Sequence, residues 1–208
     1  MCLGGFCRAG DTLQSAESTE TADRADSTRV RKIEINFAMF TPLQKLMLDG
    51  VLREGDTAGL LRPLDPSRCR RAEQDYWPQW HRADEDIRFG HVNVSEKFRH
   101  GHPGQSLYEL INQLVTSPRT SWDIPALVAV RLQDTLYVVM GNRRLKCYKQ
   151  AYEKGGVPCW FKVIIHEFPK CDRIREPATR FAFKMKAIQA MSTMNFGKEV
   201  NIHKRRRR

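Results

Sequence analysis

The segment of residues 140–145 carries residue types that can bind a phosphate group. It reads Met-Gly-Asn-Arg-Arg-Leu and joins the end of a β-branched run to a helical pattern. A glycine at a strand-to-helix turn lets backbone N–H groups approach an anion closely, and the start of the helix adds a partial positive charge. Arg143 and Arg144 add fixed charge and forked hydrogen-bond donors. We therefore predict a phosphate-binding turn that begins at Gly141.

Regular patterning from residue 86 onward predicts the domain that holds this turn. Ser106 and Glu109 form a capping box, and apolar residues then recur at helical spacing. In chain order, the predicted elements are a strand at 87–94, a helix at 107–115, a hairpin of 127–130 with 136–140, a helix at 142–153 and a strand at 160–165. This order of strand, helix, hairpin, helix and strand indicates a small α+β domain over residues 86–170.

Three further segments surround this domain. Residues 1–31 are rich in Ser, Thr, Ala, Asp and Glu and nearly devoid of large apolar residues, which predicts a disordered N-terminal segment. Residues 32–85 contain a helical pattern at 42–52, begun by Pro42, and then a Pro- and Arg-rich stretch, so we expect a helical extension and a linker. Residues 171–208 form a basic C-terminal segment.

The positive charge of the chain is concentrated near its C-terminal end. The net charge is +11, yet residues 162–208 alone hold thirteen Lys and Arg against four Asp and Glu. The run at the end is either a solvated tail, a nuclear import signal or a contact for nucleic-acid phosphates, DNA or RNA. Its residues are Lys204, Arg205, Arg206, Arg207 and Arg208.

Composition favours an intracellular protein of the nucleus or the cytoplasm. No apolar run approaches the roughly 20 residues that span a bilayer, and the first residues do not read as a secretory signal, so we expect no membrane partner.

The six cysteines include no C-x-x-C pair, which favours reduced thiols. His100 and His102 have no third ligand at metal-site spacing, and we predict no metal site. No pattern in the sequence indicates an oligomeric state.

Residues 86–167 resemble the ParB/sulfiredoxin superfamily. The resemblance rests on the Ile124-Pro125 entry to the hairpin, on the Gly-Asn-Arg-Arg turn that opens a helix, and on Val-Pro before the last strand. It implies a ParB/sulfiredoxin-like fold. It also implies that Gly141, Arg143 and Arg144 contact the phosphates of a nucleoside triphosphate, which would bring Mg²⁺ as its counterion.

The same resemblance extends to two residues ahead of the turn. Ser106 looks like the serine that sulfiredoxin places near the phosphates at the start of its first helix. Arg99, in the preceding loop, matches a further phosphate-contacting arginine more weakly. Ser106 also has a structural reading, because an N-cap hydroxyl satisfies an orphan backbone N–H.

The chain departs from this superfamily at Asn142. Sulfiredoxin needs a cysteine at this position, and ParB partition proteins have a glutamate. This chain has an asparagine there, whose side chain is an amide. An amide is no thiol nucleophile, which excludes sulfinic-acid reduction through this position. ParB partition proteins have a glutamate carboxylate at this position, and its absence here puts nucleotide hydrolysis in doubt. The 38 residues after Lys170 also leave little room for the helix-turn-helix region of partition proteins.

These residues are compatible with three alternative functions. The first is a nucleotide- or phosphate-binding protein, with a triphosphate or a nucleic-acid phosphate held at the turn from Gly141 to Arg144. The second is a basic nucleic-acid-binding module, for which the resemblance to some ParB-like proteins implies nuclease activity. The third is a non-catalytic scaffold with a decayed site, in which the two arginines are solvated. No spacing indicates a catalytic base, although Asp134 and Glu167 are available.

Overall fold

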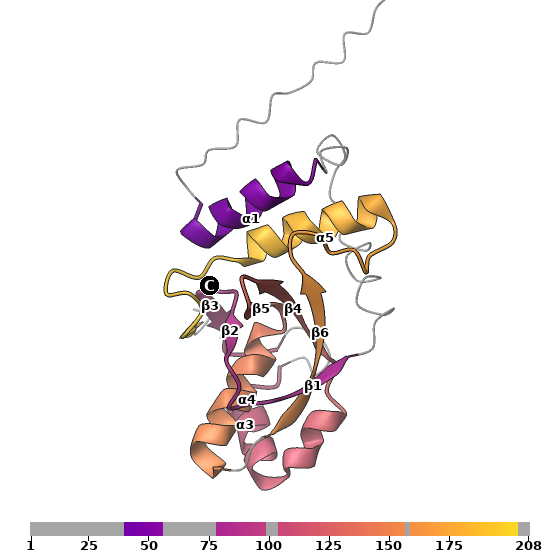
Figure 1. Ribbon diagram of the computed structural model, residues 1–208. Helices are drawn as coiled ribbons and strands as arrows, with labels where there is room; N and C mark the ends of the chain where they lie inside the picture. Colours follow the sequence, from indigo (N-terminus) through magenta and orange to yellow (C-terminus); the bar gives the residue numbers. More distant parts are fainter. Residues whose placement is uncertain (1–39, 56–77, 99–103, 157–158, 204–208) are drawn as a thin grey trace, which may run out of the picture. The chain divides into compact units, whose positions relative to one another are not determined.

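A computed structural model describes residues 40–55, 78–98, 104–156 and 159–203, which all belong to one compact unit, residues 36–208. These ranges hold four α-helices, one 3₁₀ helix and seven strands (Figure 1). The helices are α1 (Pro42–Arg53), α3 (Leu107–Thr116), η2 (Pro118–Trp122), α4 (Asn142–Gly155) and α5 (Pro177–Ala190). The strands are β1 (Gln79–Arg82), β2 (Ile87–Phe89), β3 (Asn93–Ser95), β4 (Leu127–Leu132), β5 (Thr135–Met140), β6 (Trp160–Glu167) and β7 (Asn201–His203).

A mixed five-stranded sheet in the order β1-β6-β4-β5-β2 organises the fold. The central strand β4 runs antiparallel to β5 and parallel to β6, and both of its faces are buried. Leu127 and Ala129 belong to the core that α3 and α4 complete, while the alternate residues Val128 and Val130 are buried as well. On β6, the ring of His166 packs against Phe183 of α5 with ring centroids 4.5 Å apart. Helices therefore cover the sheet on both sides.

The α+β class predicted from the sequence is confirmed, and so are the two helices and the hairpin around the turn. The hairpin joins β4 to β5 through Gln133 and Asp134, whose φ angles are +48° and +64°. Two consecutive positive φ angles are typical of the two-residue turns that match strand twist. The predicted helix at 142–153 continues to Gly155, and left-handed Gly156 ends it.

The single strand predicted at 87–94 is wrong, because the structure contains two strands in different sheets. β2 pairs with β5, whereas β3 pairs with β7 in a separate two-stranded sheet. The chain changes sheets at Gly90, whose N–H donates to the carbonyl of Val138 at 3.0 Å. A Cβ on Gly90 would lie only 2.4 Å from that carbonyl oxygen. This close backbone approach bends the chain, and only glycine permits it.

Elements from outside the predicted 86–170 domain complete the fold. β1 lies in the stretch that reads as a linker, and it pairs antiparallel with β6. α5 and β7 lie in the basic C-terminal segment. The predicted helix at 42–52 is α1, and it is fixed to α5: Gln44 Nε2 donates to the carbonyl of Ile188 at 3.0 Å, and Thr41 Oγ1 donates to that of Met191 at 3.1 Å. Residues 1–31 lie outside the described ranges.

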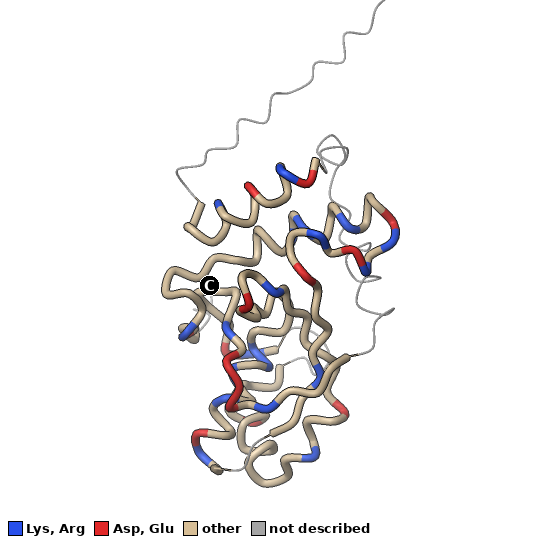
Figure 2. The backbone as a smooth tube through the Cα atoms, viewed as in Figure 1, with Lys and Arg blue, Asp and Glu red and all other residues tan. Residues whose placement is uncertain are grey.

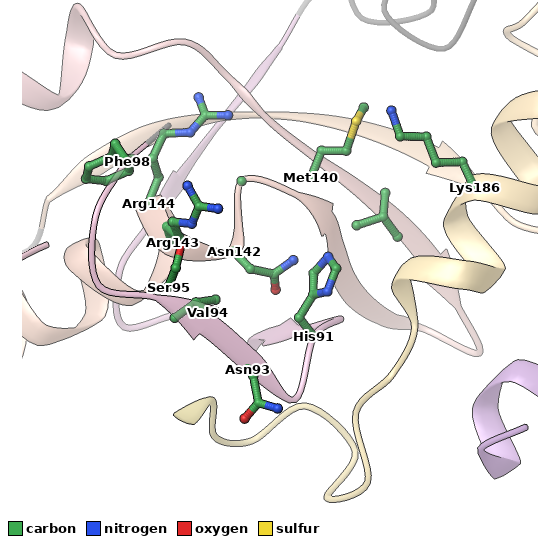
Figure 3. A pocket seen from close by; sticks show the side chains of 12 residues that line it. His91, Asn93, Val94, Ser95, Phe98, Met140, Asn142, Arg143, Arg144 and Lys186 are labelled. Atoms are coloured by element: carbon green, nitrogen blue, oxygen red, sulfur yellow. The ribbon is translucent and has the colours of Figure 1, made fainter. Parts of the chain in front are cut away.

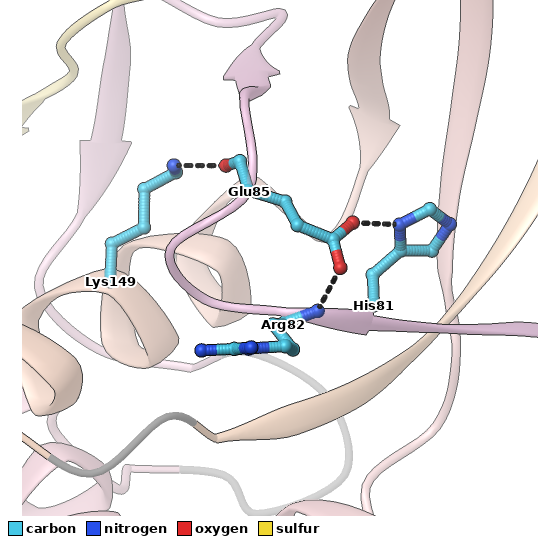
Figure 4. Close-up of polar contacts among 4 residues, drawn as sticks. All are labelled: His81, Arg82, Glu85 and Lys149. Carbon is cyan, nitrogen blue, oxygen red and sulfur yellow. Dashed lines mark hydrogen bonds and ion pairs between the residues drawn. The ribbon is translucent and has the colours of Figure 1, made fainter.

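The turn after β1 connects the edge of the sheet to α4 through Glu85 (Figure 4). The Glu85 carboxylate shares a hydrogen bond with His81 and accepts the backbone N–H of Arg82 at 3.0 Å. The Glu85 carbonyl accepts a hydrogen bond from Lys149 Nζ of α4 at 3.2 Å. One residue therefore fixes the end of a short edge strand to a helix of the core.

Charged residues of both signs are spread along the backbone of the described chain (Figure 2). Lys and Arg are frequent along α5 and in the loop before it, interspersed with Asp172 and Glu176. Within the described ranges, no helix combines the length and the apolar character that a membrane crossing requires.

The buried ring of His166 should make stability depend on pH. Burial lowers its pKa from 6.5 to about 4, and the positive charge of Arg173 acts in the same direction. Between pH 6.5 and about 4, His166 therefore binds a proton in the unfolded chain but not in the folded chain. The contribution of neutral His166 to the free energy of unfolding is fully present above pH 6.5 and is lost as the pH falls toward 4. The loss should amount to roughly 3 kcal/mol, at about 1.36 kcal/mol per pKa unit.

Urea unfolding of wild type and His166→Leu across this pH range tests the expectation. The free energy of unfolding of the variant should depend less on pH than that of wild type. His203→Gln, at an exposed histidine of β7, is the matched control and should keep the wild-type slope. Equal slopes for wild type and His166→Leu would contradict the assignment.

Candidate functional site

The turn between β5 and α4 is built around a left-handed glycine. Gly141 occupies the N-cap position of α4 with φ +99°, a backbone conformation that L side chains rarely adopt. A Cβ on this residue would lie 2.5 Å from Leu127 Cδ2 and 3.0 Å from Arg144 Nη2. The turn therefore requires glycine both for its dihedral angle and for space, and it presents the N-terminus of a 14-residue helix to the surroundings.

The side chain of Asn142 is directed into the protein and ties two strands together. It is only 4% exposed. Its Nδ2 donates to the carbonyl of Val138 on β5 at 2.8 Å, and its Oδ1 accepts the N–H of Gly90, just after β2, at 3.0 Å. Both ends of the amide are thus used, as a donor and as an acceptor. A carboxylate could not donate to Val138, and a thiol is too weak a hydrogen-bonding group to replace both bonds.

Arg144 supports the turn from its other side. Its guanidinium donates to the carbonyl of Pro125 and, at 3.2 Å, to that of Ala126, in the segment that enters β4. Arg144 thereby fixes the start of the hairpin against the start of α4. The two arginines of the motif consequently have different surroundings, and Arg144 has a structural task in addition to its charge.

A cleft of about 590 Å³ opens in front of the turn (Figure 3). Basic side chains from three separate parts of the chain line it: His91 from the segment between β2 and β3, Arg143 from α4 and Lys186 from α5. The remaining lining residues are Asn93, Val94, Ser95, Phe98, Val139, Met140, Gly141, Asn142 and Arg144. None of the described residues that line the cleft is acidic, so its wall is positively charged.

The pKa of His91 is lowered in this environment. Burial lowers the pKa of the ring, and the nearby positive charge of Arg143 lowers it further, while a hydrogen bond with the backbone of Val139 opposes both effects. The cleft therefore combines permanently charged side chains with an imidazole whose pKa is lowered. A ligand that brings negative charge would favour the protonated ring.

The structure brings together four of the six residues predicted at the phosphate site. Gly141, Asn142, Arg143 and Arg144 all line the cleft. Ser106 is the N-cap of α3, where its hydroxyl accepts the N–H of Glu109 at 3.2 Å and completes the predicted capping box. It is not among the residues that line the cleft, and its contact with a phosphate stays a prediction.

The other predicted contacts lie outside the described residues. These are Arg99 and the tail from Lys204 to Arg208. Their proposed roles stay predictions. Sequence reasoning in turn missed His91 and Lys186, since neither has a motif around it and both reach the cleft only through the fold.

The cysteines that the structure describes do not line the cleft. Cys147, Cys159 and Cys171 are free and buried. Burial raises the pKa of Cys147 to about 12, so this thiol stays protonated. In the part of the chain that the structure describes, no three His, Cys, Asp or Glu side chains are grouped as a metal ion would require.

The chain matches no protein-family model, and neither curated proteins nor solved structures gave a match. The resemblance to the ParB/sulfiredoxin superfamily therefore stays a prediction that rests on the motif and the order of elements.

The two left-handed glycines at the ends of α4 allow a matched comparison. Gly156→Ala should cost about 1 kcal/mol, because a Cβ there meets nothing within 4 Å and only the left-handed backbone is penalised. Gly141→Ala should cost about 3 kcal/mol or more, because overpacking against Leu127 adds to the same penalty. Urea unfolding of both variants measures the difference, and equal losses would show that the turn has room for a side chain.

The bridging role of Asn142 predicts that Asn142→Asp is strongly destabilising. The carboxylate cannot donate to Val138 and would be a buried charge, so we expect a loss of roughly 2–4 kcal/mol at neutral pH. Asn93→Asp, at an exposed asparagine of the same cleft, should change stability by less than about 0.5 kcal/mol. Similar losses for the two variants in urea unfolding would refute the bridging role.

Proposed function

We propose that the protein binds a phosphate-bearing ligand, most specifically a nucleotide, in the cleft in front of Gly141. The observation that carries the proposal is the convergence of Arg143, Lys186 and His91, from three separate elements, around the N-terminus of α4. Side chains from distant parts of the chain that offer donors and positive charge to one space suit an anionic ligand.

The helix end contributes in addition to the side chains. The first backbone N–H groups of an α-helix have no partner within the helix, and the macrodipole adds a partial positive charge. Because Gly141 has no side chain, an anion can approach these donors closely. Arg143, on the first turn of α4, supplies a charged fork that suits phosphate oxygens.

The size and lining of the cleft favour a nucleotide over inorganic phosphate. A volume of about 590 Å³ lies within the usual range for small-molecule sites. Phe98, Val94 and Val139 give part of the lining apolar character, against which a base or a sugar could pack. The cationic and the apolar parts together match a ligand with a charged and a flat end.

The residues support binding more than catalysis. Asn142 offers neither a thiol nor a carboxylate, and its amide is occupied by Gly90 and Val138. Among the described lining residues, His91, whose pKa burial lowers, is the best suited to act as a general base. No described lining residue is a carboxylate that could hold Mg²⁺, so the ion would be held by the phosphate oxygens and water.

Arg143→Gln tests the proposal. In calorimetric titrations with ATP, CTP, GTP, ADP and inorganic phosphate, each with and without Mg²⁺, at least one nucleotide should bind wild type. The variant should bind it about tenfold or more weakly, because a charge-assisted hydrogen bond is lost. Arg53→Gln, at an exposed arginine of α1, is the control and should bind like wild type.

The NMR titration of His91 gives a second readout at the same site. Removing the positive charge in Arg143→Gln should raise the pKa of His91, and bound phosphate should raise it in wild type. If the pKa of His91 rises in the variant but no nucleotide or phosphate binds wild type, the geometry is correct and the cleft is that of a non-catalytic scaffold. That result would refute the proposed function.

A further inference from the structure

Three large aromatic side chains lie exposed together at the edge of the sheet opposite β2. Trp80 of β1, Trp122 of η2 and Trp160 of β6 are 47%, 49% and 44% exposed. The chain contains four tryptophans, so most of them are placed at one surface. Large exposed apolar clusters of this kind mark interaction sites, because water contact with several indole rings is unfavourable.

The pairing of β1 with β6 sets the pattern on this surface. In their antiparallel register, Trp80 lies opposite Lys162 and Arg82 lies opposite Trp160. Side chains alternate along a strand, so these four share one face of the pair, while Phe161 between them is buried in the core. The result is an alternating arrangement of two tryptophans and two cations.

The third tryptophan closes a hollow with the other two. The Trp122 ring lies edge-on to Trp80, with centroids 6.1 Å apart and planes at 66°. Ser121, next to it, is fully buried and donates a hydrogen bond to the carbonyl of Trp160, which holds η2 against β6. Trp80, Trp122 and Trp160 line a space of about 460 Å³, which we call the tryptophan hollow.

Each ring of the tryptophan hollow has a cation over it. Lys162 Nζ lies 5.5 Å from the Trp80 ring centroid, and the guanidinium carbons of Arg119 and Arg82 lie 5.7 Å and 5.9 Å from those of Trp122 and Trp160. These contacts fix the rings and surround the hollow with positive charge. Arg82 also pairs with Asp84 at 2.8 Å, which neutralises part of this charge.

We propose that the tryptophan hollow binds a single-stranded nucleic acid. Bases would stack on the indole rings, and the adjacent cations Lys162, Arg119 and Arg82 would contact the phosphates. Proteins that bind single strands without sequence preference combine aromatic platforms with positive charge in this way. The site is separate from the cleft at Gly141 and does not depend on the function proposed for it.

The charges distinguish this ligand from others that aromatic clusters bind. A methylated ammonium group prefers an aromatic cage, but three neighbouring cations would repel it. A proline-rich peptide uses an aromatic groove and gains nothing from positive charge around it. Membrane-bound tryptophans anchor in the interface by their rings, whereas these rings face a shared hollow, which suits a flat base. A polyanion with aromatic faces satisfies both the rings and the cations.

Fluorescence anisotropy of labelled oligo(dT) and oligo(U), each of about 12 nucleotides, tests the proposal on the full chain. Wild type should bind at least one of them more tightly than a duplex of the same length. Trp80→Ala and Trp160→Ala should each weaken binding about tenfold. Trp80→Phe keeps a stacking ring and should weaken it less. Tyr108→Ala, at an aromatic side chain of α3 that is 44% exposed, is the matched control and should bind like wild type.

Two further controls separate this surface from other parts of the chain. With Lys204 to Arg208 replaced by glutamine in the full chain, the effect of the Trp80 and Trp160 variants should persist. The same variants should keep the response of the cleft to nucleotide, so failure of one site can be told from failure of the other. Circular dichroism confirms that each variant is folded.

The proposal is overturned if neither oligonucleotide binds, or if binding is insensitive to both tryptophan substitutions. It is equally overturned if the tryptophans prove necessary only for a proline-rich peptide, or only for vesicles of equal parts phosphatidylcholine and phosphatidylserine.

Discussion

The amide of Asn142 is the interaction on which the site depends most. It donates to Val138 and accepts from Gly90, so one side chain connects the end of β5, the end of β2 and the start of α4. Gly90 in turn brings the chain close enough to Val138 that no side chain fits there. His91 follows directly and lines the cleft. The position that the superfamily resemblance assigns to reactive chemistry therefore serves here to hold strands together.

The fold distributes two kinds of surface to opposite edges of one sheet. The cleft lies where β5 meets α4, near β2, and its wall is positively charged. The tryptophan hollow lies on β1 and β6, at the other edge. Both present positive charge, but the cleft adds a helix terminus and the hollow adds aromatic faces. Under the two proposals, the cleft would hold a whole nucleotide, and the hollow would hold the bases of a single strand while the adjacent cations contact its phosphates.

Patterns in the sequence were sufficient to predict helices and turns that neighbouring residues determine. They were insufficient where contacts with residues distant in the sequence determine the structure. The capping box at Ser106 and the hairpin through Gln133 and Asp134 follow from neighbouring residues alone. The break at Gly90 depends on a carbonyl 48 residues away, and the four-residue strand β1 forms because β6 offers it a partner. Likewise, Arg143 and Arg144 read alike in sequence, and the contacts of Arg144 with the carbonyls of Pro125 and Ala126 become apparent only in the fold.

The attachment of α1 to α5 fixes the N-terminal helix to an element that also lines the cleft. Gln44 of α1 bonds the carbonyl of Ile188, two residues beyond Lys186, which lines the cleft. Thermodynamic coupling is reciprocal, so a ligand that moved Lys186 against this bond would be resisted by the docking of α1, and the reverse would hold equally. The helix that precedes the predicted domain therefore anchors the element that supplies Lys186 to a cleft that it does not itself line.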